Sequence, residues 1–252
     1  MRASSVLRLV TVAVLTSPLA HAADAGAPPA PGGSAHRHGS SDHYDHDFSD
    51  IAKYVKAFEG PARDAWQKPD EVVKLLQLRT GHIVADIGAG TGYFVPRLSK
   101  AVGPQGRVLA IDVEPHMVAH LKARVEKEGL RNVTAQAAGA DDPGLAEGSV
   151  DRILIVDTWH HIPQRARYSA ALARALRPGG FVAVVDFTAR SPEGPPARHR
   201  LSPEAVIAEL QAGGLRARVV RENLPHQYVV IGEKPEGVTG TSGTSAAPPV
   251  PK

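Results

Sequence analysis

The sequence of 252 residues contains no cysteine. This absence excludes disulfide bonds, thiolate zinc sites and cysteine nucleophiles. A basic stripe is also missing, because 29 Lys and Arg residues are nearly balanced by 26 Asp and Glu residues, so we expect no nucleic-acid partner. The sequence has no apolar run long enough to cross a bilayer as a helix. Hydrophobic residues make up 42 %, which suffices for the core of one ordinary domain with tails.

The first 22 residues have the three parts of a secretory signal peptide. Arg2 and Arg8 come before the short apolar run 9–15, and small residues follow at 20–22. Cleavage after Ala22 predicts an exported, periplasmic protein without an integral membrane segment. If the signal does not function, the protein stays in the cytoplasm.

Composition divides the rest of the chain into three parts. Residues 23–46 are rich in Ala, Gly, Pro and His and predict a flexible linker, and residues 235–252 predict a disordered tail. The folded domain is therefore expected at 47–234. The linker's histidines and aspartates could bind a divalent metal, but nothing in so polar a segment fixes ligand geometry. We predict no metal site and keep metal binding as an alternative.

Strand and helix patterns alternate along the expected domain. Strand patterns lie at His82–Ile87, Arg107–Ile111, Val133–Gln136, Ser149–Val156 and Phe181–Phe187. Helix patterns lie at Asp50–Phe58, Pro69–Leu78, Tyr93–Val102, Pro115–Lys127, Pro163–Leu176 and Pro203–Ala212. This alternation predicts a parallel sheet covered on both faces. The last two strand patterns, Leu215–Arg221 and His226–Gly232, have no helix between them and predict an antiparallel hairpin at one edge.

A glycine loop, residues 88–92, follows the first strand pattern. Glycines let a ligand approach the main chain closely, and the helix that follows offers free N–H groups. The loop of NAD enzymes needs a third glycine where this chain has Tyr93, which argues against an NAD-dependent oxidoreductase. Asp86 suits the ammonium and sulfonium charges of S-adenosylmethionine better than a diphosphate. Asp112, at the end of the next strand pattern, stands where a ribose-binding acid is expected.

Two segments, Val84–Phe94 and Val108–Val118, resemble motifs I and II of class I S-adenosylmethionine-dependent methyltransferases. The chain is similar to predicted bacterial methyltransferases of unassigned substrate over most of its length between the tails. The resemblance implies an α/β, Rossmann-like, doubly wound fold: a seven-stranded, mostly parallel sheet with an antiparallel C-terminal hairpin. It also implies S-adenosyl-L-methionine as the cofactor. Further matching segments are Pro61–Pro69, Val156–His161, Leu176–Gly180 and Asn223–Gln227.

The resemblance also implies roles for single residues. Those expected around the methionine part of the cofactor are Asp86, Gly88, Gly90 and Gly92. Those expected around ribose and adenine are Asp112, Val113 and Glu114. The loop 139–143 would cover adenine, and many relatives have an aspartate where this chain has Gly139. The contact with the adenine amino group would then come from Asp141, from Asp142 or from backbone groups.

Residues 157–161 are expected to line the methyl end of the cofactor, because ligands bind at the carboxyl ends of parallel strands. His160 or Asp157 could take a proton from a hydroxyl or amine acceptor, or the histidine could cap the next helix instead. Adjacent residues leaving a strand point in opposite directions, so we expect only one of His160 and His161 to face the substrate. Trp66 is interpreted as part of a lid or as a core anchor.

The first hypothesis for function is an S-adenosylmethionine-dependent methyltransferase that acts on a small-molecule acceptor. The alternative is an exported, non-catalytic protein that keeps the fold and binds a nucleoside or a metal. The signal peptide motivates the alternative, because the cofactor is made in the cytoplasm. The acceptor and the oligomeric state are not predicted.

Overall fold

A computed structural model describes residues 50–236. The predicted signal peptide 1–22, the predicted linker 23–46 and nearly all of the predicted tail 235–252 lie outside the described residues. Within the part of the chain that the structure describes, no helix is long and apolar enough to span a membrane.

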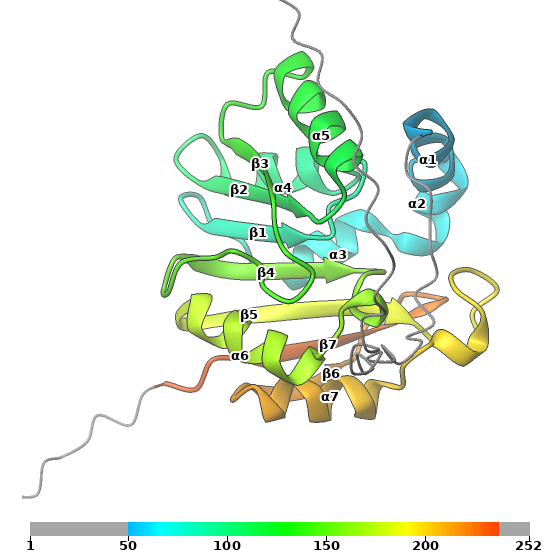
Figure 1. Ribbon diagram of the computed structural model, residues 1–252, viewed down its shortest axis with the longest axis vertical. Coiled ribbons are helices and arrows are strands. Elements are labelled where there is room, and N and C mark those ends of the chain that lie inside the picture. Colours follow the sequence, from blue (N-terminus) through cyan, green and yellow to red (C-terminus); the bar gives the residue numbers. More distant parts are fainter. Residues whose placement is uncertain (1–49, 237–252) are drawn as a thin grey trace, which may run out of the picture. The chain divides into compact units, whose positions relative to one another are not determined.

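Seven strands form one sheet in the order β3-β2-β1-β4-β5-β7-β6 (Figure 1). Strand β7 pairs antiparallel with both β5 and β6, and the other neighbouring strands pair in parallel. The predicted mostly parallel sheet with an antiparallel C-terminal hairpin is therefore confirmed. The strands are β1 Ile83–Ile87, β2 Arg107–Asp112, β3 Val133–Ala137, β4 Val150–Val156, β5 Leu176–Phe187, β6 Arg216–Val220 and β7 Gln227–Glu233.

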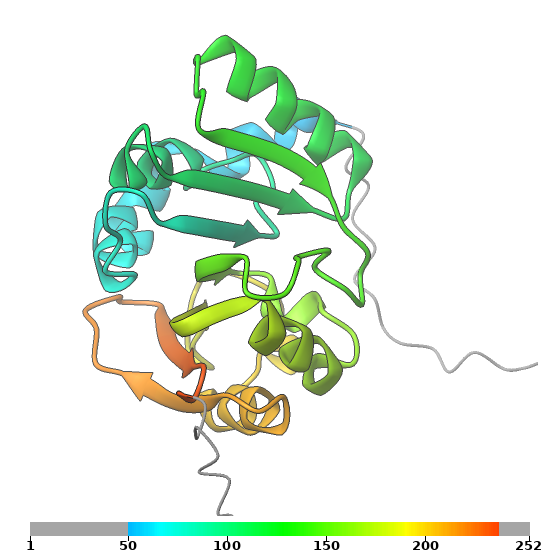
Figure 2. The same cartoon turned by 90° about the vertical axis from the view of Figure 1, so that its left-hand side faces the viewer.

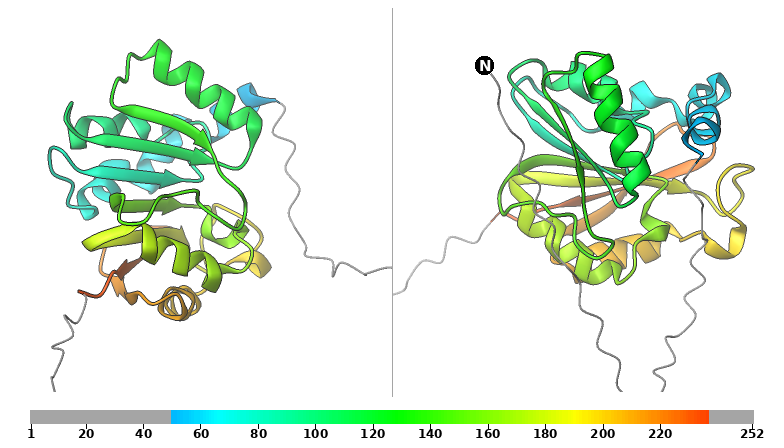
Figure 3. Two further views of the ribbon diagram at one scale, coloured as in Figure 1. Left: turned by 60° about the vertical axis from the view of Figure 1, so that its left-hand side comes forward. Right: turned by 45° about the horizontal axis from the view of Figure 1, so that its top comes forward.

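Helices cover the sheet from both sides, with α3 and α4 on one side and α6 on the other (Figure 2). At one edge lie α5 and β3, and at the other lie β6 and β7 (Figure 3). The helices are α1 Ile51–Phe58, α2 Pro61–Gln67, α3 Pro69–Leu75, α4 Val95–Val102, α5 Pro115–Lys127, α6 Arg165–Ala175 and α7 Pro203–Ala212, with the short 3₁₀ helices η1 Trp159–His161 and η2 Ala197–His199.

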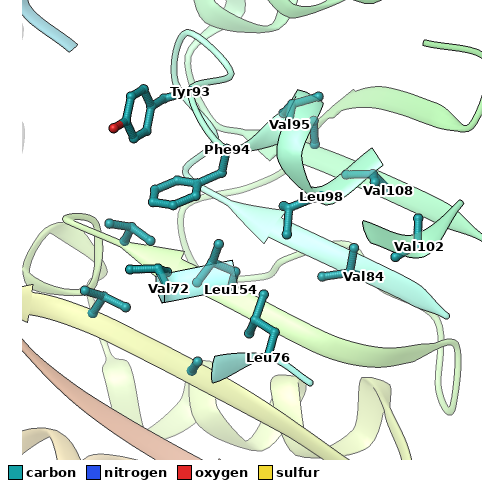
Figure 4. Close-up of a cluster of buried hydrophobic side chains, with 14 of the residues drawn as sticks. Val72, Leu76, Val84, Tyr93, Phe94, Val95, Leu98, Val102, Val108 and Leu154 are labelled. Carbon is teal, nitrogen blue, oxygen red and sulfur yellow. The ribbon is translucent and has the colours of Figure 1, made fainter. Parts of the chain in front are cut away.

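Two buried clusters explain why the central strands are apolar throughout. Val84 and Leu154 pack into the cluster under α3, α4 and α5 (Figure 4), whereas Ala85 and Ile153 pack into the cluster under α6 and α7. Strands of a parallel sheet are buried on both faces, so a polar residue within them is expected only where it has a specific role. Asp86 of β1 and Asp186 of β5 are two such polar residues, at 3 % and 1 % exposure.

Helix α2 was not among the predicted helices. The sequence indicates a break at Gly60-Pro61, and α1 does end at Phe58. Gly60, however, is the N-cap of a new helix whose first residue is Pro61, a position where proline needs no N–H partner. Lys68, at φ 45°, then turns the chain into α3. As a result α1 and α2 lie beyond the carboxyl ends of β1 and β4 (Figure 1).

Candidate active site

A cavity of about 410 Å³ lies at the carboxyl ends of the central strands. Its walls come from segments far apart in the sequence: α1 and α2, the glycine loop after β1, the end of β2, the residues after β4 and the loop after β5. In parallel sheets the strand ends and their loops meet at one edge. The topology therefore brings most of the predicted site residues to one place.

The glycine loop is fixed to the neighbouring strand. The N–H groups of Gly88 and Ala89 both donate to the carbonyl of Ile111, at 2.8 and 3.0 Å. Gly88 has φ 72°, and a Cβ atom there would lie 2.3 Å from Oγ1 of Thr158. Gly90 has φ 55° and lines the cavity, and a Cβ atom there would have no neighbour within 3.8 Å. The first glycine is thus required by packing, and the second leaves the main chain open to a ligand.

Two carboxylates adjoin this loop. Oδ2 of Asp86 is buried and has no hydrogen-bond partner among residues 50–236. Burial first, and the charge of Asp112 second, raise the pKa of Asp86 to about 7. Asp112 ends β2 and accepts hydrogen bonds from the N–H groups of Gly90, at 2.8 Å, and Glu114, at 2.9 Å. Burial raises the pKa of Asp112, against the lowering effect of these backbone donors.

The other residues predicted to bind the cofactor lie around the cavity's rim or outside it. Gly92, at φ 91°, packs against α5, where a Cβ would lie 2.9 Å from a methyl carbon of Leu121. Val113 is 51 % exposed, and Glu114 is the N-cap of α5. Asp141 is exposed, with Oδ2 4.0 Å from Nη1 of Arg167. Their roles in binding stay predictions.

His160 belongs to a buried pair that the sequence did not indicate. Its Nδ1 atom lies 3.0 Å from Oδ1 of Asp186, near the end of β5, and its side chain is 4 % exposed. Asp186 also accepts the N–H of Phe187 at 2.8 Å. A carboxylate at Nδ1 holds the proton on that nitrogen, so the neutral ring carries its lone pair on Nε2. The same ring lines the cavity.

The strand-based reason for expecting only one of the two histidines to face the substrate does not apply in the structure. Strand β4 ends at Val156, and Trp159–His161 form a 3₁₀ turn instead of an extended chain. The alternation of side chains along a strand does not apply to such a turn. The rings of His160 and His161 lie 4.2 Å apart between centroids, and both residues line the cavity.

Asp157 takes part in a closed ring of polar side chains. It accepts from Nη2 of Arg63 at 3.3 Å and from Nε2 of Gln227 at 2.5 Å. Gln67 joins the two, because it accepts from Arg63 and donates to Gln227 at 2.6 Å. Burial raises the pKa of Asp157 to about 7, against the lowering effect of Arg63. This ring attaches α2 to the end of the sheet.

Trp66 lies on α2 and lines the cavity. Its ring is 5.9 Å from that of Phe187 and 6.4 Å from that of His226, between centroids. The guanidinium of Arg63 packs on the ring of Tyr93 at 4.2 Å. Sequence reasoning named Trp66 as a possible lid residue but gave no site role to Arg63, Asp186, Phe187 or Gln227. Their roles depend on contacts between distant segments.

Comparisons with known proteins agree with this geometry. A family model described as a methyltransferase domain matches residues 84–180. A ubiquinone/menaquinone biosynthesis C-methyltransferase, UbiE, of Coxiella burnetii is 29 % identical over 124 residues, which are 49 % of each chain. The methyltransferase GfsG of Streptomyces halstedii is 31 % identical over 48 % of this chain and 43 % of its own. The chain thus spans about half the length of the curated relatives it matches.

The similarity to solved structures covers more of the molecule. A YcgJ protein from Bacillus subtilis shares the fold at 18 % identity, with a TM-score of 0.56 over 68 % of this chain and 99 % of that one. An S-adenosylmethionine-dependent methyltransferase from Aquifex aeolicus is 32 % identical, with a TM-score of 0.68 over 73 % of this chain and 98 % of that one. The chain therefore belongs to the class I S-adenosylmethionine-dependent methyltransferases, and S-adenosylmethionine is its cofactor.

Proposed function

We propose that this protein transfers the methyl group of S-adenosylmethionine to a small-molecule acceptor that gives up a proton, with His160 as the base. The observation that carries the proposal is the buried pair of His160 and Asp186, because His160 lines the same cavity as the glycine loop. A histidine held in this way is suited to general base catalysis. The cofactor site and the base would thus share one cavity.

The cofactor fits the residues that are present. A buried ionised carboxylate requires partners for its oxygens, and Oδ2 of Asp86 has no hydrogen-bond partner within residues 50–236. The ammonium and sulfonium groups of S-adenosylmethionine would supply cationic partners. Gly88 and Gly90 would let the methionine part lie against the main chain, and Asp112 would accept hydrogen bonds from the ribose hydroxyls.

The bound cofactor supplies a methyl group on a positively charged sulfur. The chain's own residues would orient the acceptor and remove its proton. Asp186 keeps the proton of the neutral imidazole on Nδ1 and stabilises the imidazolium that forms when Nε2 takes the acceptor's proton. Asp157 would act by position, because both of its oxygens already accept hydrogen bonds. It holds α2 at the cavity through Arg63.

The names of the relatives support a small acceptor. Besides the quinone-pathway enzyme, they include an arsenite methyltransferase of Halobacterium salinarum, 30 % identical over 44 % of this chain and 29 % of its own. Neither name identifies the acceptor of this protein. It has to come from the chemistry of its own cavity.

Calorimetry on the full chain with S-adenosylmethionine and S-adenosylhomocysteine tests the cofactor site. Transfer of labelled methyl groups to a panel of small acceptors then tests the reaction. We expect His160→Gln to lower kcat about 100-fold or more with unchanged cofactor affinity, the usual contribution of a general base. Failure to bind either compound at millimolar concentration, or full activity of His160→Gln, would refute the proposal.

A further inference from the structure

Part of the cavity lining consists of flat apolar side chains, called here the aromatic wall. Phe58 of α1, Trp66 of α2 and Phe187 at the end of β5 line the cavity, together with Pro195. Trp66 and Phe187 support each other, with ring centroids 5.9 Å apart. Aromatic walls favour flat apolar ligands, because ring faces and edges pack closely. This part of the cavity therefore fits an aromatic ring better than a flexible polar chain.

The loop after β5 is held in one shape by a single side chain. Nη1 of Arg200 donates to the carbonyls of Thr188, Ala189 and Ser191, at 3.2, 3.2 and 2.7 Å. Nε donates to Pro195 at 2.8 Å, and Nη2 donates to Glu193 at 3.1 Å. The loop's position over the cavity is thus set before a ligand arrives, which reduces the entropy lost on binding.

Glycine brings this loop against the aromatic wall. Gly194 has φ 87°, and a Cβ atom there would lie 2.4 Å from Cδ2 of Phe187. Glu193, the preceding residue, is exposed and lines the cavity. The close contact therefore holds this part of the loop, with Glu193 next to Gly194, at the edge of the cavity.

The charges around the cavity disfavour an anionic acceptor. Among the described residues that line it, four are acidic: Asp86, Asp112, Asp157 and Glu193. Arg63 is the sole Lys or Arg in that set. Its guanidinium already donates to the carbonyl of Phe58, to Gln67 and to Asp157. With Asp86 and Asp112 engaged by the cofactor and Asp157 by Arg63, an acceptor with a carboxylate or phosphate would meet the charge of Glu193 and no unpaired Lys or Arg among the described lining residues.

The reacting end sets a second limit on the acceptor. His160 can take a proton only from a group that carries one. A cationic ammonium would be repelled by the positive sulfur of the cofactor, whereas an oxygen that gains negative charge as its proton leaves is attracted to it. A hydroxyl group on an aromatic ring has a proton for His160 to take, a flat face to pack on the aromatic wall, and no charge of its own.

We propose that the methyl acceptor is an uncharged phenol and that Glu193 is a specificity residue that excludes anionic acceptors. This proposal rests on the proposed methyltransferase function. The O–H bond breaks and its proton passes to Nε2 of His160. A lone pair of the oxygen forms the new O–C bond, and the S–C bond breaks with its electron pair left on sulfur as S-adenosylhomocysteine. The imidazolium then returns its proton to solvent.

Three probes of matched size test the expected preference for an uncharged acceptor, with the full chain as the enzyme. Para-ethylphenol is neutral, para-hydroxyphenylacetate is an anion and tyramine is a cation at neutral pH, and all three carry the phenolic hydroxyl. With labelled S-adenosylmethionine we expect kcat/KM for the neutral probe to exceed that for each charged probe about tenfold or more. The product should carry its methyl group on oxygen. Para-ethylcyclohexanol, which lacks the flat ring, should react least.

Two variants test the role of Glu193. Glu193→Gln should raise kcat/KM for the anionic probe about threefold, the effect of one partly solvated charge, while the affinity for S-adenosylhomocysteine stays unchanged. Glu147→Gln, which removes an exposed charge from the turn before β4, is the matched control and should leave all three values unchanged.

The outcomes separate this proposal from the one it rests on. If the protein does not bind S-adenosylhomocysteine, the proposed function fails. If it binds the cofactor but prefers the anion or the amine, or methylates none of the phenols, only the acceptor proposal is overturned. Equal effects of Glu193→Gln and Glu147→Gln would overturn the role of Glu193 alone.

Discussion

Nδ1 of His160 lies 3.0 Å from Oδ1 and 3.1 Å from Oδ2 of Asp186. The two residues are brought together by the pairing of β4 with β5, in which Val156 lies opposite Val185. The histidine follows the first of these strands within a 3₁₀ turn, and the aspartate is the penultimate residue of the second. The pair therefore depends on the register of the sheet.

Replacing Asp186 by Asn should impair catalysis more than binding. The amide keeps the size of the side chain but cannot stabilise an imidazolium by charge, so we expect kcat to fall by at most the contribution of the base itself, about 100- to 10,000-fold. The Kd of S-adenosylmethionine should not change. Steady-state kinetics and calorimetry measure the two quantities.

Asp186→Glu is the conservative partner of that variant and should restore part of kcat, because it restores the charge. Circular dichroism on both variants checks that the fold is kept. Equal kcat values for Asp186→Asn and Asp186→Glu would show that Asp186 supports the fold and not the reaction.

Cofactor affinity should depend on pH through Asp86, whose pKa is about 7 without ligand. The cationic cofactor binds the ionised carboxylate, so below pH 7 a proton must first leave. The Kd of S-adenosylmethionine should therefore fall as the pH rises toward 7 and level off above it. Asp86→Asn should weaken binding about 10- to 100-fold and remove this dependence. Asp70→Asn, at a 92 % exposed side chain, is the control and should do neither.

The attachment of α2 should make a measurable contribution to stability. The side chains of Arg63 and Asp157 are 13 % and 18 % exposed, so Arg63→Gln leaves a buried carboxylate without its charged partner. We expect the free energy of unfolding to fall by about 2–3 kcal/mol in urea titrations. Arg218→Gln breaks an exposed pair with Glu233 and should cost less than about 1 kcal/mol. Similar losses for both variants would contradict the ring of hydrogen bonds around Asp157.

The glycines of the loop should respond differently to alanine. Gly88→Ala combines a positive φ with a contact of 2.3 Å to Thr158 and should lower the free energy of unfolding by about 2 kcal/mol or more. Gly90→Ala has space and should cost about 1 kcal/mol, the strain alone, while cofactor binding is lost. Gly129→Ala, at φ 64° with no atom within 4 Å, controls for strain outside the site.

The predicted signal peptide gives a cellular prediction. Residues 1–41 fused to a reporter that is active only after export should direct the reporter out of the cytoplasm. Substituting Asp for Val10 and Val12 interrupts the apolar run and should abolish export. A reporter that stays inactive with the unmodified segment would place the protein with its cofactor in the cytoplasm.

The sequence by itself determined the order of the strands, of every α-helix except α2, and the cofactor loop. These features depend on local chemistry: apolar strand runs, proline in first turns, glycines at positive φ and an aspartate that interrupts a buried strand. Helices α5 and α7 have the predicted bounds, since Pro115 and Pro203 start them. The predicted helix Pro69–Leu78 ends three residues early, at Leu75, because Gln77 adopts φ 49°.

The tertiary structure alone decided which residues share the catalytic end of the cavity. In the sequence, Asp186 is one position at the end of an apolar strand pattern. The pairing of β4 with β5 places it against His160. Arg63 and Gln227, 164 positions apart by their numbers, meet around Asp157 because α2 folds over the strand ends. A local pattern cannot report such contacts, since sheet register and helix packing fix them through the burial of the whole core.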